Sequence, residues 1–365
     1  MGSALTRALA PALSCAALLL GASGRPAAGP ATAEAPERRA ARIADLLRQD
    51  CSAGAILVEG HELLTPALER QLKRCCRTGS AAQQRVAIAA LGRLVSAGHK
   101  RLVSDLVVLF RQATDDDIRV AALLALGDQA PPGLLPQLLE LYRRQPPGDS
   151  AVLAHIGRLG RGKDLIAIAD RLGADLEISV FDPGSPAVQA VQQLIDRDDQ
   201  TSVGHFRQRW PALDRRRRLV ALLVFGGARE LAAMPLITGL LTPLDDEDPQ
   251  NQRLFEVGFW TLARISNRAA LDQLRAFAFG QRDPTRVQRT TRVHPNVRPE
   301  YAVQVRAFAL RALVHATPRR DCASLASEIL AQPGTAYGSV ADANWAAAVE
   351  IALRELEQRY GAPLP

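Results

Sequence analysis

An apolar segment with helical spacing recurs along the chain at a period near 33 residues. Residues 119–127 read RVAALLALG, and residues 218–226, three periods later, read RLVALLVFG. Gly160 lies one period after Gly127. Apolar side chains at positions i, i+3, i+4 and i+7 form one face of an α-helix. Recurrence at this period is typical of folds that stack one supersecondary unit many times.

A second helical segment accompanies the first. The apolar pattern at 102–110 recurs at 134–142, and turns rich in glycine and proline at 131–133, 146–148 and 226–227 separate the segments. Aromatic residues make up only 4% of the chain, and the alternation typical of strands is nearly absent. We therefore expect an all-α protein, an α-solenoid of stacked antiparallel helical hairpins.

Local signals predict where several helices begin. Thr65 and Ser185 each precede a proline, and an N-cap hydroxyl followed by proline at the first helical position is a common helix start. The acidic residues 115–117 precede another predicted helix, whose N-terminal end favours negative charge.

The motif at 117–127, an acidic residue followed by Ile-Arg-Val-Ala-Ala-Leu-Leu-Ala-Leu-Gly, resembles the HEAT repeat. It is most similar to the short variety named after phycobilisome lyases. The resemblance covers about residues 80–330, is cleanest at 115–145 and is weakest at 165–210. It implies a HEAT/armadillo-like superhelix and specifies a class of repeat rather than a function.

The resemblance also implies roles for particular side chains. In HEAT repeats an Asp and an Arg tie neighbouring repeats together, which implies this role for Asp117 and Arg119. Arg218 and Arg306 occupy the place of Arg119 in other copies, although neither has an Asp two residues before it.

Residues 1–33 are expected to be a signal peptide. Arg7 precedes an apolar run at 8–22, and Ala31-Thr32-Ala33 has the form of a signal-peptidase site. The run is shorter than the roughly 20 residues that span a bilayer. An uncleaved anchor and a lipoprotein attached at Cys15 are the alternatives. From this leader we expect export to the periplasm or cell surface of a bacterium. Nearly all basic residues are Arg and Ala is abundant, which indicates GC-rich coding.

The expected domain organisation follows from the leader and the repeat. Residues 34–80 are expected to form N-terminal capping helices, and residues 81–365 the HEAT-repeat array. An acidic insertion at 242–252 and a basic loop insertion at 280–299 interrupt the period. Insertions in repeat proteins map to loops on one face, often the binding face; a solvated or disordered loop is the alternative.

Four cysteines lie beyond the leader, and an even number in an exported chain permits disulfides. Cys51 paired with Cys75 or Cys76 would close the first hairpin if the loop at 52–60 returns the chain alongside Cys51. Cys322 is expected to be a small buried residue. No Cys-x-x-Cys spacing is present, so a zinc site is not expected.

Signatures of catalysis are absent from the sequence. The di-iron enzymes of the HEAT class use several His-Glu pairs, whereas this chain has only His61-Glu62. Hydrolase elbows, nucleotide loops and His-Glu-x-x-His motifs do not occur. We therefore expect no enzyme, no metal and no cofactor. The formal charge of +7 is modest and the three tryptophans are scattered, so nucleic acid is not an expected partner.

The leading hypothesis is a monomeric, non-catalytic interaction scaffold of the cell envelope that binds a protein partner along its surface. We also expect no membrane span in the mature chain. The alternative is a binding module for an acidic ligand that uses the arginine-rich loop 282–298. The candidate binding residues are Arg286, Arg289, Arg292 and Arg298 in this loop, with Arg215 and Arg216 at the start of a helix.

Overall fold

The chain is all-α in the computed structural model, which describes residues 35–61, 63–145, 151–178, 181–198, 200–241, 249–280, 299–332 and 339–360. No β-strand occurs in these ranges. The leader at 1–33 lies outside them. No helix among the described residues is long and apolar enough to cross a membrane.

The described residues form a series of α-helices. They are α1 (Pro36–Gln49), α2 (Cys51–Ile56), α3 (Pro66–Thr78), α4 (Ala81–Ser96), α5 (Leu102–Gln112), α6 (Asp116–Leu126), α7 (Leu135–Arg144), α8 (Ala151–Leu159), α9 (Gly162–Ile178), α10 (Pro186–Ile195), α11 (Thr201–Arg209), α12 (Arg215–Ala228), α13 (Met234–Leu240), α14 (Pro249–Ile265), α15 (Arg268–Ala278), α16 (Pro299–Ala316), α17 (Cys322–Leu330) and α18 (Ser339–Tyr360).

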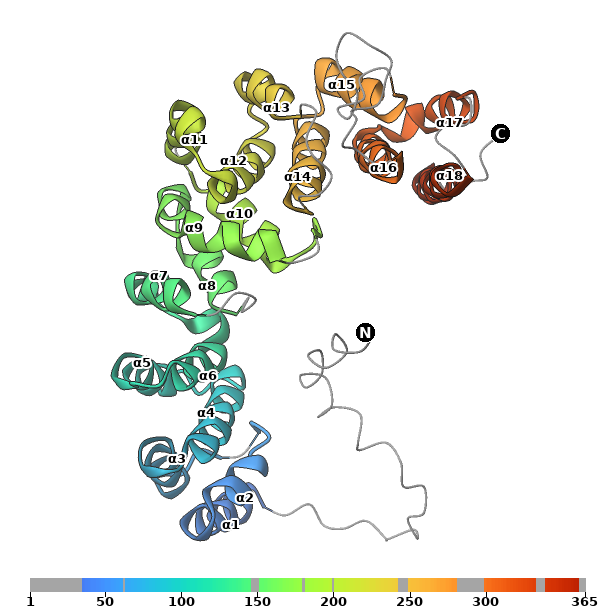
Figure 1. Ribbon diagram of the computed structural model, residues 1–365. Coiled ribbons are helices and arrows are strands. Elements are labelled where there is room, and N and C mark those ends of the chain that lie inside the picture. The colour runs from blue at the N-terminus through green and yellow to red at the C-terminus, as the bar shows by residue number, and fades with distance from the viewer. Residues whose placement is uncertain are drawn as a thin grey trace, which may run out of the picture.

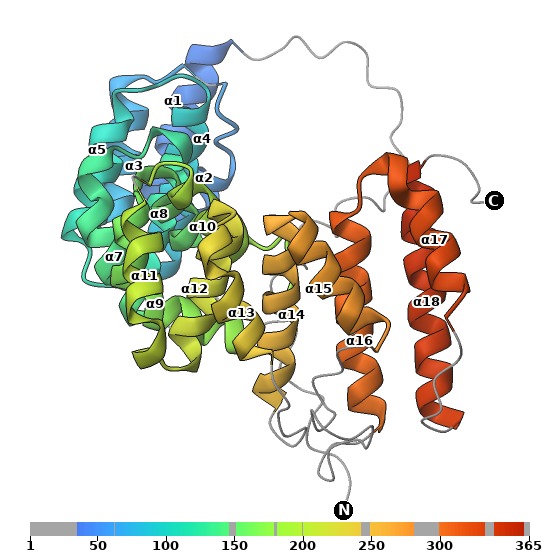
Figure 2. The same ribbon diagram turned by 90° about the horizontal axis from the view of Figure 1, so that it is seen from above.

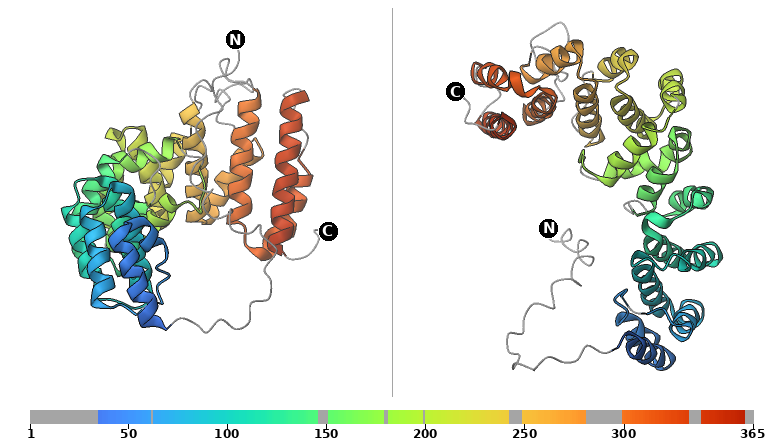
Figure 3. Two further views of the ribbon diagram at one scale, coloured as in Figure 1. Left: turned by 90° about the horizontal axis from the view of Figure 1, so that it is seen from below. Right: turned by 180° about the vertical axis from the view of Figure 1, so that it is seen from behind.

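The helices form two layers along an arc (Figure 1). Even-numbered helices make up the inner layer, on the concave side of the arc, and odd-numbered helices make up the outer layer. Helices α12, α14, α16 and α18 contact one another in series, as do α4 with α6 and α8 with α10. Seen from above, α14, α16 and α18 lie side by side with similar axes (Figure 2). The view from behind shows the same arc, with α1 and α18 near opposite ends (Figure 3).

Small residues let the inner helices approach closely. A Cβ added at Gly92 of α4 would lie 2.8 Å from the Cα of Ala125 in α6, and one at Gly157 of α8 would lie 2.8 Å from the Cα of Ala190 in α10. Each pair is separated by one 33-residue period. The abundance of Ala and Gly therefore has a packing cause, because bulkier side chains would push the two backbones apart.

Helix starts follow the local signals. Thr65 accepts a hydrogen bond from the backbone N–H of Leu68, and Ser185 accepts one from Val188. Both predicted N-caps are thus confirmed. At Ser80 the structure adds a reciprocal capping box with Gln83, a Ser-x-x-Gln pattern that is legible in the sequence.

The region with the weakest repeat pattern, 165–210, begins within the long helix α9. Helix α9 continues through Asp175, although an acidic residue at that position interrupts its apolar pattern. Asp175 is 9% exposed and accepts a hydrogen bond from the Tyr142 hydroxyl. A polar contact between outer helices here replaces the apolar contact that the repeat pattern predicts.

Candidate binding surface

A disulfide joins the first helices of the array. Cys51 begins α2, Cys75 lies in the last turn of α3, and their Sγ atoms are bonded with the Cα atoms 5.6 Å apart. Of the two pairings left open, the structure therefore has Cys51–Cys75. Residues 52–60, which were expected to form a loop, include most of the short helix α2. Cys76 and Cys322 are free and buried, and burial raises the pKa of the Cys76 thiol to about 12.

The arginines that begin α12 face acidic residues of α9. Arg216 Nε lies 2.6 Å from Glu177 Oε2. Arg217 donates from Nε and Nη2 to the two carboxylate oxygens of Asp170, at 2.6 and 2.8 Å. These ion pairs join α12 to α9, and they favour a structural role for Arg216 over the expected ligand contact. Arg215 lies at the first position of the same helix.

The other candidate binding residues belong to the basic insertion. Arg286, Arg289, Arg292 and Arg298 lie outside the residues that the structure describes. Their role in binding an acidic ligand stays a prediction.

The arginines expected to tie neighbouring repeats contact the outer helix of their own hairpin. Arg119 Nε in α6 donates to the carbonyl of Ala113, the C-cap of α5, at 2.9 Å. Arg306 Nε in α16 likewise donates to Ala278 O at the end of α15, at 3.1 Å. Arg306 also joins two neighbouring hairpins as implied, because its guanidinium lies 4.2 Å from the ring centroid of Trp345 in α18. For Arg119 the implied role is corrected, because this arginine, near the start of α6, lies beside the end of the outer helix that precedes it.

Arg218 and Asp117 differ from this pattern. The guanidinium of Arg218 lies 5.7 Å from the ring centroid of Trp210, which follows α11 directly. This contact also stays within one hairpin. Asp117 of α6 pairs with Arg85 of α4 at 3.6 Å, so Asp117, like Arg306, joins two neighbouring hairpins as implied.

A different set of arginines links the inner helices. Each lies near the end of one inner helix and donates to carbonyls at the end of the preceding one, groups that helix termini leave unpaired. The pairs are Arg93 with Ala55 O at 2.9 Å, Arg158 with Gly127 O at 2.6 Å, Arg197 with Gly157 O at 2.8 Å, and Arg359 with Val314 O at 2.7 Å. Sequence reasoning missed these arginines, although the Gly-Arg pairs at 92–93 and 157–158 were a usable signal.

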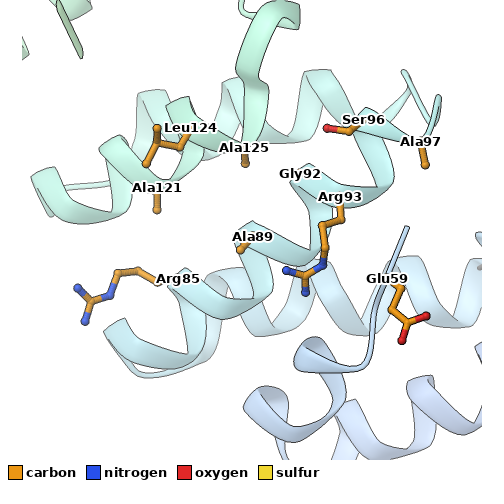
Figure 4. A pocket seen from close by; sticks show the side chains of 10 residues that line it. All are labelled: Glu59, Arg85, Ala89, Gly92, Arg93, Ser96, Ala97, Ala121, Leu124 and Ala125. Atoms are coloured by element: carbon orange, nitrogen blue, oxygen red, sulfur yellow. The ribbon is translucent and has the colours of Figure 1, made fainter. Parts of the chain in front are cut away.

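A shallow hollow lies between α4 and α6 on the side that faces away from the outer layer; we call it the N-terminal hollow. Its volume is about 590 Å³. Ala121 and Ala125 of α6 point toward Ala89 and Gly92 of α4, and these small residues form its floor (Figure 4). Leu124 lies at its edge with 59% of its surface exposed. The hollow therefore offers an apolar surface that no large side chain fills.

Charged residues lie at the two ends of the N-terminal hollow (Figure 4). Arg85, at one end, pairs with Asp117. Glu59, at the other end, pairs with Arg39 at 2.9 Å and lies 3.4 Å from His61. A third charged lining residue, Arg93, donates to backbone carbonyls. Each charged group of the lining thus has a partner within the chain, and the apolar floor is the part of the hollow that is left for a ligand.

A second hollow, here the C-terminal hollow, lies between α14 and α16 and is narrower. Its volume of about 70 Å³ exceeds several-fold the roughly 10–15 Å³ that one water needs by the same measure. The apolar lining residues are Phe181, Pro183, Trp260, Ala263, Phe308 and Ala312. Phe181 lies edge-on to Trp260, with ring centroids 6.0 Å apart. The space suits one leucine- or phenylalanine-sized side chain.

Three ionisable side chains also line the C-terminal hollow, namely Glu256, Arg311 and His315. Glu256 is ion-paired with Arg253, and burial raises the pKa of its carboxyl group. Arg311 Nε and His315 Nε2 each lie 3.8 Å from a carboxylate oxygen of Glu355 in α18. Burial lowers the pKa of His315, while Glu355 acts in the opposite direction.

Comparison of the chain with protein-family models, with curated proteins and with solved structures found no match. Within the described ranges, no cluster of three or more histidine, cysteine or carboxylate side chains has a metal-binding arrangement. The two hollows are therefore the features of this surface that indicate what it binds.

Proposed function

We propose that this chain is a HEAT-like α-solenoid that acts as a non-catalytic interaction scaffold and binds a protein partner along its inner layer. The recurrence of the motif at 119–127 and the serial contacts between inner helices support the repeat class. In such arrays each repeat contacts its neighbours, and the result is a long surface on which a partner can lie.

The N-terminal hollow is the observation that most directly supports a protein partner. Its floor consists of alanine and glycine, and the large apolar side chain of Leu124 stands exposed at its edge. A ridge of apolar side chains from a partner helix or strand fits such a groove and removes both surfaces from water, at about 25 cal/mol per Å² of apolar area.

The proposed compartment is the cell envelope, reached through a signal peptide at 1–33. The Cys51–Cys75 bond supports this location, since disulfides persist in oxidising compartments and are rare in the cytosol. The leader residues lie outside the described ranges, and N-terminal sequencing of the exported chain tests their cleavage.

A capture experiment with matched variants tests the proposed function. The tagged protein is exported in its own host, cross-linked, and recovered together with bound proteins. Leu124→Glu, which places a charge at the N-terminal hollow, should remove the principal captured protein. Leu330→Glu is the control, because Leu330 is 62% exposed at the end of outer helix α17. Equal capture by both variants would contradict a partner at this hollow.

A further inference from the structure

We propose that the C-terminal hollow binds the last residue of a polypeptide, with its apolar side chain between Trp260 and Phe308 and its free carboxylate on Arg311. The inference rests on the proposed function only in taking a polypeptide as the occupant. It adds the chemical class of the segment that is bound and a second place on the inner layer where binding occurs.

The walls of the hollow select an apolar side chain. Trp260 and Phe308 come from neighbouring inner helices, and Ala263 and Ala312 leave the space between them. The guanidinium of Arg264 lies 5.8 Å from the Trp260 ring centroid, so the Trp260 ring already has a cation near it. An incoming aromatic or branched aliphatic side chain therefore matches these walls better than a second cation does.

Arg311 provides the positive charge. Its side chain is 64% exposed, and its Nε lies 3.8 Å from Glu355, longer than the roughly 2.7–2.9 Å of a charge-assisted hydrogen bond. A guanidinium has five N–H donors in a planar fork, and this loose pair leaves donors for a carboxylate. His315 lies one helical turn further along α16 and adds positive charge when it is protonated.

The position of the charge beside the apolar walls favours a chain end over an internal acidic residue. A C-terminal residue presents its side chain and its carboxylate from the same α-carbon. In an extended peptide, consecutive side chains point to opposite faces. An Asp next to a buried Leu or Phe would therefore direct its carboxylate away from Arg311, which lines the same hollow as Phe308.

Glu256 opposes this binding and thereby provides a sharp test. Its carboxylate lines the same hollow and repels an incoming carboxylate, although the ion pair with Arg253 offsets part of that repulsion. Removing the charge with Glu256→Gln should strengthen binding of a carboxylate. A cationic ligand would respond in the opposite direction, because Glu256 would then be its counter-ion.

The test uses N-acetyl-Ala-Ala-Phe with a free C-terminal carboxylate and the same peptide as its C-terminal amide, each titrated into the purified protein by calorimetry. The acid should bind at least about tenfold more tightly than the amide, as expected for a charged hydrogen-bonded pair. Arg311→Gln should abolish that preference, and Glu256→Gln should tighten binding of the acid. Arg354→Gln, on the exposed face of α18, is the control and should change nothing.

Four results would overturn the inference: no binding up to the solubility limit of the peptide, equal affinity for acid and amide, a preference that survives Arg311→Gln, or weaker binding of the acid by Glu256→Gln. Circular dichroism of each variant checks that it folds. Leu124→Glu should leave the affinity for the peptide unchanged. If the peptide does not bind but Leu124→Glu still removes the captured partner, only the present inference is refuted. If the peptide binds as expected but Leu124→Glu and Leu330→Glu capture the partner equally, only the proposed partner site at the N-terminal hollow is refuted.

Discussion

The Tyr142 hydroxyl donates a hydrogen bond to Asp175 Oδ2 at 2.6 Å, from outer helix α7 to outer helix α9. Arg171 completes the arrangement: it pairs with the other oxygen of Asp175 and donates from Nε to the carbonyl of Gln145, the C-cap of α7. Its guanidinium also lies 5.0 Å from the Tyr142 ring centroid. Two neighbouring helix pairs are thus joined by a buried polar network in which each charged group has a partner.

Tyr142→Phe should lower the free energy of unfolding by about 1–2 kcal/mol, because it leaves the buried Asp175 carboxylate with one donor fewer. Urea unfolding at neutral pH measures this. A double-mutant cycle with Asp175→Ala should show coupling between the two substitutions, since each removes the same hydrogen bond. Independent, additive effects would contradict the assigned hydrogen bond.

The same contact predicts how stability changes in alkaline solution. Burial raises the pKa of Tyr142, and the hydrogen bond to Asp175 raises it further. The folded state therefore holds the phenolic proton more tightly than the unfolded state. This contribution is fully present below the unfolded pKa of about 10 and is lost as the pH rises above it. Tyr142→Phe should flatten the alkaline loss of stability.

Gly92→Ala should destabilise the protein by about 1–3 kcal/mol, the usual cost of overpacking, because the added Cβ would meet the backbone of Ala125 at 2.8 Å. Gly204→Ala is the matched control: Gly204 lies within α11, and nothing is within 4 Å of its added Cβ. That substitution should stabilise by about 0.5–1 kcal/mol through helix propensity. Thermal unfolding of both variants compares them, and similar shifts would refute the close helix approach.

Arg197→Met should lower the free energy of unfolding by about 2 kcal/mol, because it leaves carbonyls at the end of α8 without their charged donor. Arg197 donates to Gly157 O at 2.8 Å and to Gly160 O at 3.1 Å. Arg320→Met is the control, since its side chain is 85% exposed and should change stability by under about 0.5 kcal/mol. Equal effects in chemical denaturation would mean that the link between inner helices contributes nothing.

Replacing Cys51 and Cys75 together by Ala should destabilise the N-terminal helices by about 3 kcal/mol in the chain-entropy account. The bond closes a loop with a sequence separation of 24 residues. Because neighbouring helices in an array unfold locally, hydrogen exchange should accelerate in α1–α3 and stay unchanged in α16. Acceleration in both regions, or in neither, would contradict a local role for the disulfide.

His315 should titrate below the ordinary histidine pKa near 6.5, because burial penalises its charged form and outweighs the attraction of Glu355. Its contribution to stability is therefore present above about pH 6.5 and is lost as the pH falls below that value. An NMR titration measures the imidazole. Glu355→Gln should lower the pKa of His315 further, whereas Glu350→Gln, on the same helix, should not. An unshifted His315 would contradict the geometry of the C-terminal hollow.

Several features of this molecule were predictable from short stretches of sequence. The N-caps at Thr65 and Ser185 and the absence of strands from the described ranges followed from residue type and apolar spacing. The choice between Cys75 and Cys76 did not, because consecutive residues of a helix point in directions that only the neighbouring helix distinguishes. The resemblance to HEAT repeats named Arg119 correctly as a structural residue but misplaced its partner.

The sequence by itself determined that this chain is helical and where several helices begin, since caps, prolines and apolar periodicity act over a few residues. Tertiary structure alone decided which carbonyl each arginine reaches and where alanine and glycine leave a hollow. Those contacts join residues such as Arg197 and Gly157, 40 positions apart. Their geometry depends on how neighbouring inner helices lie against each other, which no local pattern specifies.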